Sequence, residues 1–272
     1  MDNNFNIKDK VCVITGGSGV LGGEVAAYLL KQKAKVVILG SNQERLDAKL
    51  AILSAIEPNN VIGYVCSVIE ENEVKETSKK ILEKWGCIDV LINAAGGNMP
   101  GATISEDKTI FDLELADFDK VSNLNLKGTL IPSLVFGKHM AKQGKGVILN
   151  YSSMAVYQAI TRVIGYSSSK AAVTNLTQWM AMEFAIKFGD KLRVNAIAPG
   201  FFVAQQNSKL LLNTDGSYTS RGQKIINNTP MGRFGKAEEL NGAIHWLISD
   251  ASSFVTGAIV PVDGGFSSFS GV

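Results

Sequence analysis

The stretch TGGSGVLGG at residues 15–23 decides the fold of this chain. It follows a short apolar run, VCVI at 11–14, and leads into a helix-like segment at 20–33. Glycine lets the backbone turn sharply and approach a ligand closely, and a helix N-terminus attracts a phosphate. Gly17, Gly19 and Gly22 spell G-x-G-x-x-G between a predicted strand and a predicted helix, which favours a dinucleotide site. A tight turn that binds no ligand is the alternative.

Apolar runs alternate with amphipathic segments along the rest of the chain. Strands are predicted at 11–14, 35–39, 61–65, 88–92, 146–151, 192–197 and 258–262. Helices are predicted near 20–33, 42–56, 70–85, 116–142, 164–188 and 237–249. This order predicts an α/β fold: one Rossmann-like, doubly wound domain over 1–272, with about seven parallel strands and helices on both faces. The long connections near 97–115 and 199–236 are expected to be substrate loops.

Composition excludes several classes of function. The net charge is +2 and the basic residues are scattered, so neither a nucleic-acid surface nor a basic membrane patch is expected. The sequence contains no run of about 18 apolar residues, so no membrane span is expected. The N-terminus lacks an apolar signal core. Cys12, Cys66 and Cys87 have no paired spacing, and His139 and His245 lie in helical patterns. We therefore expect no metal site, and a reducing, cytoplasmic location.

The end of the second predicted strand bears on the choice of cofactor. An NAD-selective fold places an acidic residue about 20 residues after the glycine turn, where it binds the ribose 2′-OH. Gly40 stands there, and no carboxylate occupies 39–43. Ser41, Asn42 and Arg45 could instead bind a 2′-phosphate, so NADP(H) is weakly favoured over NAD(H). Arg45 as a solvated helix residue is an equally good interpretation.

The clearest chemical pattern is Tyr166-x-x-x-Lys170, with Ser153 thirteen residues before the tyrosine. Four residues apart on a helix, Tyr166 and Lys170 share one face. A nearby ammonium stabilises a phenolate, so Lys170 is predicted to lower the tyrosine pKa and make it useful in proton transfer. The Ser153 hydroxyl could hold the substrate oxygen meanwhile. Asn125 lies inside a predicted helix, where its side chain could bend the helix or hold a water.

Together these residues resemble the short-chain dehydrogenase/reductase family. The resemblance also covers NAAG at 93–96, RVNAIAPG at 193–200 and VDGG at 262–265. It implies a nicotinamide cofactor and a catalytic tetrad of Asn125, Ser153, Tyr166 and Lys170. The predicted cofactor-binding residues lie in the glycine turn, at strand ends and on the tyrosine helix: Gly16, Ser18, Gly19, Val20, Leu21, Ser41, Asn42, Arg45, Ser67, Asn93, Ala94, Ala95, Gly96, Tyr166, Lys170, Pro199, Gly200 and Phe202.

Several stretches, among them NAAGGNMP at 93–100 and the ending VDGGFSSFSGV, are similar to the D-mannonate oxidoreductase (fructuronate reductase) branch of that family. This resemblance implies reduction of D-fructuronate to D-mannonate. A sugar acid needs a cation and hydrogen-bonding groups. Beside Ser153 and Tyr166, the candidates are Arg162 for the carboxylate and Asn98, Gln206 and Asn207 for the hydroxyls. A surface salt bridge for Arg162 and loop-turn roles for the other three are the alternatives.

Two other functions remain open on the residues alone. The chain could reduce a keto-gluconate or a 3-oxoacyl thioester, or it could be a regulatory protein that binds a dinucleotide without catalysis. The intact tetrad argues against the second of these. The family resemblance further implies a homotetramer or homodimer through the helices near 116–142 and 164–188.

Overall fold

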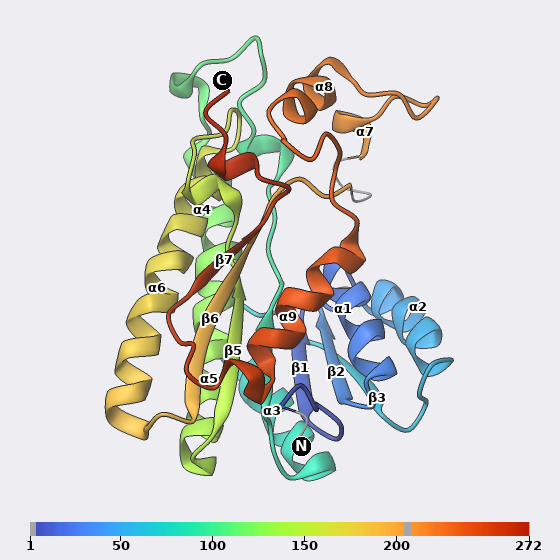
Figure 1. The fold of residues 1–272 in the computed structure, drawn as a ribbon, viewed down its shortest axis with the longest axis vertical. Coiled ribbons are helices and arrows are strands. Elements are labelled where there is room, and N and C mark those ends of the chain that lie inside the picture. The colour runs from blue at the N-terminus through green and yellow to red at the C-terminus, as the bar shows by residue number, and fades with distance from the viewer. Residues whose placement is uncertain (1–3, 204–207, 272) are drawn as a thin grey trace.

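A computed structural model describes residues 4–203 and 208–271 of the chain. Seven parallel strands form one sheet in the order β3-β2-β1-β4-β5-β6-β7 (Figure 1). The strands are β1 (Val11–Thr15), β2 (Lys35–Gly40), β3 (Val61–Val65), β4 (Val90–Asn93), β5 (Gly146–Tyr151), β6 (Leu192–Pro199) and β7 (Ile259–Val262). The predicted fold class and the seven predicted strands are confirmed.

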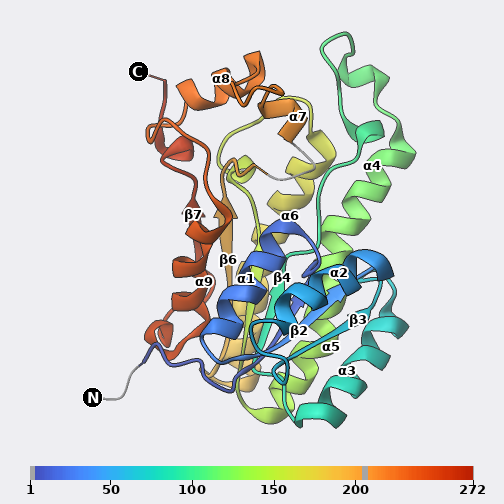
Figure 2. The same ribbon diagram turned by 90° about the vertical axis from the view of Figure 1, so that its right-hand side faces the viewer.

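Helices connect the strands and cover both faces of the sheet (Figures 1 and 2). They are α1 (Val20–Lys31), α2 (Gln43–Ser54), α3 (Glu71–Trp85), α4 (Leu115–Ser122), α5 (Gly128–Gln143), α6 (Ile164–Phe188), α7 (Ser208–Leu211), α8 (Ser220–Asn227) and α9 (Asn241–Ile248). None of the described helices is long and apolar enough to cross a membrane.

Alternate residues of each strand enter different cores, because successive side chains point to opposite faces. Along β1, Cys12 and Ile14 pack in one core with α1, α2 and α9. Val11 and Val13 pack in the other core with α3, α5 and α6. Burial on both faces explains why the strands read as continuous apolar runs.

The predicted helix over 116–142 is not one regular helix. A π-helical turn, Asn123–Lys127, separates α4 from α5. Within it the Asn125 side chain donates to the Val121 carbonyl at 2.8 Å and to the Gly97 carbonyl at 2.7 Å. Asn125 thus lies in a local widening of the helix, a feature found often at functional sites.

The two long connections contain short elements that periodicity could not reveal. Segment 97–115 has two single 3₁₀ turns, and segment 199–236 contains α7 and α8. Figure 2 shows both segments at the end of the molecule toward which the strands point their carboxyl ends. In parallel sheets this edge carries the ligand crevice.

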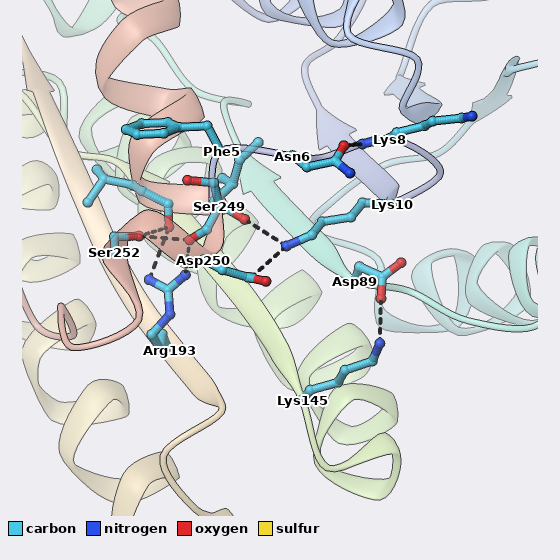
Figure 3. Close-up of polar contacts among 12 residues, drawn as sticks. Phe5, Asn6, Lys8, Lys10, Asp89, Lys145, Arg193, Ser249, Asp250 and Ser252 are labelled. Carbon is cyan, nitrogen blue, oxygen red and sulfur yellow. Dashed lines mark hydrogen bonds and ion pairs between the residues drawn. The ribbon is translucent and has the colours of Figure 1, made fainter. Parts of the chain in front are cut away.

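At the opposite edge of the sheet, polar contacts join segments that are far apart in the sequence (Figure 3). The buried Arg193 guanidinium donates to the carbonyls of Leu247 and Ser249, both at 3.0 Å. It thereby satisfies carbonyl groups at the C-terminus of α9. Lys10 pairs with Asp250 at 3.0 Å and joins the N-terminal segment to the same corner.

Candidate active site

The candidate site begins where the strand order reverses, between β1 and β4. Thr15 pairs with Asn93 across the two strands, and the Ala95 N–H donates to Thr15 Oγ1 at 3.1 Å. Gly16 has φ +66°, and a Cβ there would lie 2.9 Å from the Ala94 carbonyl oxygen. Only glycine permits this approach of the turn to residues 94–95.

The glycine turn fits a phosphate. Gly19 caps α1 with its backbone alone, so the first helical N–H groups, beginning with Val20 and Leu21, face outward without a side-chain cap. A Cβ at Gly22 would lie 2.6 Å from the Gly16 carbonyl oxygen, so the helix starts close beneath the turn. These outward N–H groups and the helix dipole suit the pyrophosphate of a dinucleotide.

At the end of β2 the Ser18 hydroxyl lies where a side chain on Gly40 would begin. A Cβ at Gly40 would lie 2.6 Å from Ser18 Oγ, so the serine hydroxyl occupies that space. Ser41, Asn42 and Arg45 are exposed beside it. Asn42 Oδ1 accepts from the Arg45 N–H at 2.9 Å and caps α2, which leaves its amide NH₂ and the Arg45 side chain facing solvent.

Two predicted cofactor residues direct their side chains elsewhere. Asn93 is buried and donates to Ser133 Oγ and Asn150 Oδ1, both at 2.9 Å, because its place on β4 directs it toward the α5 side of the sheet. The Phe202 side chain packs in the core, where a Cβ at Gly235 would collide with its ring. Contacts of these two residues with a cofactor are therefore expected through their backbones, and their assignment as cofactor-binding residues stays a prediction.

Three further predicted cofactor residues lie where β3 and β6 end. Ser67 keeps its side chain half-buried after β3, while its N–H donates to Glu73 Oε2 at 2.7 Å. Pro199 ends β6, and the Gly200 N–H donates to the Val262 carbonyl at 2.9 Å. All three residues therefore stand at the carboxyl edge of the sheet, the edge at which ligands bind in this kind of fold.

Asn125 and Lys170 converge on Gly96. A Cβ on Gly96, whose φ is +155°, would lie 2.6 Å from Asn125 Oδ1 and 3.3 Å from Lys170 Nζ. Asn125 is fully buried. Its side-chain amide accepts a hydrogen bond from the Gly97 N–H at 3.1 Å and donates one to the Gly97 carbonyl. The loop after β4 is thus fastened to the π-helical turn beside the lysine.

Lys170 is buried at 3% exposure and donates to the Tyr151 carbonyl at 2.7 Å. Its ammonium lies 5.6 Å from the centre of the Tyr166 ring. Burial lowers the pKa of Lys170 from 10.5 to about 8, because the charged form loses hydration. The ammonium therefore remains mostly protonated at neutral pH.

Tyr166 and Ser153 complete the group. Their side chains form a hydrogen bond, which lowers the pKa of the Tyr166 phenol, but the larger effect of burial raises that pKa above its ordinary value of 10.0. The expected lowering of the tyrosine pKa by Lys170 is absent here. The ammonium points to the Tyr151 carbonyl and approaches the ring rather than neutralising the phenol.

The predicted substrate residues are less concentrated. Arg162, in a left-handed conformation at φ +80°, forms an ion pair with Glu106 at 2.6 Å. The exposed Asn98 donates to Thr103 Oγ1 at 2.7 Å, which is a contact within its own loop. Gln206 and Asn207 lie outside the described residues. The salt-bridge alternative for Arg162 is thus present in the structure.

The structure adds two basic residues that sequence reasoning missed. A cavity of about 530 Å³ is lined by segments following β4, β5 and β6, and Arg221 and Lys224 of α8 line it together with Arg162. Their only sequence signal is the pair of cations in SRGQKIIN, inside a segment that was expected to be a loop. Among the described residues, no group of three or more His, Cys, Asp or Glu could hold a metal.

Comparisons with known proteins agree with this geometry. The family model described as enoyl-(acyl carrier protein) reductase matches residues 18–267. A crystal structure of a candidate D-mannonate oxidoreductase from Haemophilus influenzae, with bound NAD, superposes with a TM-score of 0.90 at 42% identity over 98% of both chains.

Relatives with named reactions include a thioester reductase and a sugar-acid dehydrogenase. A 3-oxoacyl-[acyl-carrier-protein] reductase of Thermotoga maritima is 35% identical over 96% of this chain and 99% of its own. A 2-dehydro-3-deoxy-D-gluconate 5-dehydrogenase of Formosa agariphila is 34% identical over 96% of this chain and 94% of its own. The chain therefore belongs to the short-chain dehydrogenase/reductase family and is an oxidoreductase that interconverts CH–OH and C=O groups.

Proposed function

We propose that the protein reduces a keto sugar acid to its hydroxy acid with a nicotinamide dinucleotide, with D-fructuronate to D-mannonate as the best candidate. The observation that carries the chemistry is the convergence of Asn125 and Lys170 on Gly96, beside Tyr166 and next to an uncapped glycine turn. When bound, the dinucleotide supplies or accepts the hydride. Gly16, Gly19 and the first turn of α1 would hold its pyrophosphate.

In the proposed reaction Tyr166 gives its phenolic proton to the substrate oxygen, and the Ser153 hydroxyl donates a hydrogen bond to the same oxygen. A hydrogen bond from Ser153 already lowers the pKa of the Tyr166 phenol, although burial raises it more. The buried Lys170 ammonium supplies positive charge beside the tyrosine as negative charge develops there. Asn125 is a positioning residue, because it holds Gly97 and the loop after β4.

The preference for NADP(H) stays a prediction. It is supported by Gly40, which carries no carboxylate, and by the exposed Ser41, Asn42 and Arg45. Against it stands the Haemophilus relative, which holds NAD. A 2′-phosphate would find donors here but only one guanidinium, so the expected discrimination is modest.

The sugar-acid substrate is supported by the Haemophilus and Formosa relatives, whose names contain mannonate and a keto-gluconate. The second candidate is a 3-oxoacyl thioester, because the family model and the Thermotoga relative name acyl-carrier-protein substrates. An acyl chain would be served by apolar walls alone, whereas the cavity beside Arg162 also carries cations.

A substrate panel tests the proposal. Purified protein is given NADPH or NADH with D-fructuronate, a keto-gluconate or acetoacetyl-CoA, and the loss of reduced-nicotinamide absorbance is followed. We expect the highest kcat/KM with a keto sugar acid. A higher kcat/KM for the thioester would reverse the order of the two candidates, and no turnover of any carbonyl would favour the regulatory alternative.

We also propose that the protein acts as one domain over residues 1–272, in the cytoplasm, as a homodimer or homotetramer. Free Cys12, Cys66 and Cys87 support a reducing compartment. Trp179, Met182 and Ile186 are exposed along α6 at helical spacing, so they form an apolar stripe suited to a second copy. Light scattering tests the assembly, and a monomer at micromolar concentration would remove this part.

A further inference from the structure

The cavity of about 530 Å³ at the carboxyl edge of the sheet has an unbalanced charge. Arg162, Arg221 and Lys224 line it with a single acidic residue, Glu106. Within residues 4–203 and 208–271 neither Arg221 nor Lys224 forms an ion pair with an acidic side chain. The remaining walls include apolar side chains such as Ile104, Ile160 and Phe201, which strengthen electrostatic contacts by excluding water.

Arg221 is a half-buried cation of this group that has no acidic partner among the described residues. Its Nη1 donates to Thr161 Oγ1 at 3.0 Å, a neutral partner, and the residue is half-buried. Burial and the neighbouring Arg162 charge both lower the pKa of Arg221, while Glu106 raises it. The N–H groups along the edge of a guanidinium are suited to bind a carboxylate through two parallel hydrogen bonds.

The Glu106 carboxylate already occupies part of this basic cavity. Its carboxylate contacts Arg162 at 2.6 Å but is 84% exposed, so the ion pair is worth little and exchanges at low cost. Arg162 in turn lies in the loop just before α6, the helix whose first turn carries Tyr166. A carboxylate bound in place of Glu106 would therefore lie beside the start of the helix that carries the proposed proton donor.

We propose that Arg221, with Arg162, binds the substrate carboxylate in this cavity, and that Glu106 occupies the site until the substrate replaces it. The inference rests on the proposed keto sugar acid reduction and names the residues that select the acid. Arg221 thus supplies the recognition for which only Arg162 was predicted, and Glu106 weakens substrate binding by competing for the same guanidinium.

The test compares D-fructuronate with D-fructose, which carries the same ketone but a hydroxymethyl group instead of the carboxylate. We expect Arg221→Met to raise KM for D-fructuronate about 10- to 100-fold, as for loss of a charged hydrogen-bonded pair, with little change for D-fructose. Arg221→Lys should recover part of the loss. Glu106→Gln should lower KM for the acid severalfold and leave the neutral sugar unchanged.

Lys142→Met is the matched control, because Lys142 is an exposed cation at the far end of α5, at the opposite edge of the sheet. It should not change either KM. An equal loss for both sugars in Arg221→Met, or an unchanged acid preference, would overturn the proposal. A preference for acetoacetyl-CoA that depends on Arg221 would also overturn it, since the cavity would then serve a different anion.

A binding measurement separates this proposal from the reaction itself. D-mannonate should raise the melting temperature of the wild-type protein and of Glu106→Gln, but not that of Arg221→Met, and mannitol should raise none of them. If the protein turns over no keto acid but shows this pattern, the carboxylate site stands and the proposed function fails. If it turns over D-fructuronate without the pattern, the proposed function stands and the site fails. Inorganic phosphate in the same assay should act more weakly than D-mannonate.

Discussion

The two sides of the candidate site are built differently. Ser153, Asn125 and Lys170 are buried, and they are held by hydrogen bonds with backbone groups of Ala155, Val121 and Tyr151, respectively. On the substrate side, Arg162 and Arg221 are only partly buried and are held by the hydroxyl of Thr161 and the exposed carboxylate of Glu106. The rigid side is suited to one chemical step, whereas the other side can exchange its partners for a ligand.

The two sides of the site should respond differently to a single substitution. On the rigid side a change should reduce turnover of every substrate, because all of them use the same proton donor. On the substrate side a substitution should change KM, and it should do so only for anionic substrates. The predictions below test this division, beginning with the largest effect.

Tyr166→Phe should lower kcat about 10²- to 10⁴-fold with both D-fructuronate and D-fructose, because it removes the proton donor. The residue is half-buried and its phenol is hydrogen-bonded to Ser153, so the variant should fold and melt near the wild-type temperature. Steady-state kinetics and circular dichroism check this. Near-normal turnover in a folded variant would remove Tyr166 from the mechanism.

Gly96→Ala should lower kcat about 10- to 100-fold, because the new methyl group would displace Asn125 Oδ1 or Lys170 Nζ from positions 2.6 and 3.3 Å away. It should also cost about 1–3 kcal/mol in stability from the φ of +155°. Gly86→Ala is the matched control, since Gly86 has φ +75° but no atom within 4 Å of its Cβ position. The control should lose stability and keep its kcat. Equal activities in the two variants would show that the contacts around Gly96 do not matter.

Lys170→Met should inactivate the enzyme yet stabilise the cofactor-free protein below pH 8. Lys170 holds its proton up to about pH 8 when folded, against 10.5 when unfolded, a gap equivalent to about 3 kcal/mol at 1.36 kcal/mol per pKa unit. Loss of the hydrogen bond to Tyr151 returns about 1 kcal/mol of this. The net gain should be about 1–2 kcal/mol.

The pH dependence gives the sign of this effect. Below pH 8 both states hold the proton, and the folded wild type bears the full cost of a buried charge. Between pH 8 and 10.5 the unfolded chain binds more protons, so the stability of the wild type rises toward that of the variant. Denaturant titrations at pH 7, 9 and 10.5 measure it. A stability difference that stays constant across this range would contradict the assignment.

Arg45→Ala should have the smallest effect, a fall of up to about fivefold in kcat/KM for NADPH with no change for NADH, because Arg45 is exposed and screened. Lys31→Ala is the control, because Lys31 is an exposed cation at the C-terminus of α1, away from the predicted phosphate turn. An equal fall in kcat/KM for NADPH and NADH would contradict a 2′-phosphate site at Arg45.

Local spacing was enough to predict the strands, the glycine turn and the pair Tyr166 and Lys170. Strand and helix periods and an i,i+4 relation depend only on neighbours in the chain. The same reasoning does not give the direction of a side chain at a strand end. The Asn93 side chain bonds Asn150 in the core, and the Phe202 ring packs against Gly235 of a distant segment.

The sequence alone determined the fold class, the phosphate turn and the identity of the candidate proton-transfer residues. Only the tertiary structure decided that Asn125 and Lys170 meet at Gly96, that burial rather than the lysine governs the Tyr166 pKa, and that Arg221 joins Arg162 in one cavity. The physical reason is that burial and charge at the site come from segments that follow different strands. Their meeting at one edge of the sheet depends on strand order, which no local pattern encodes.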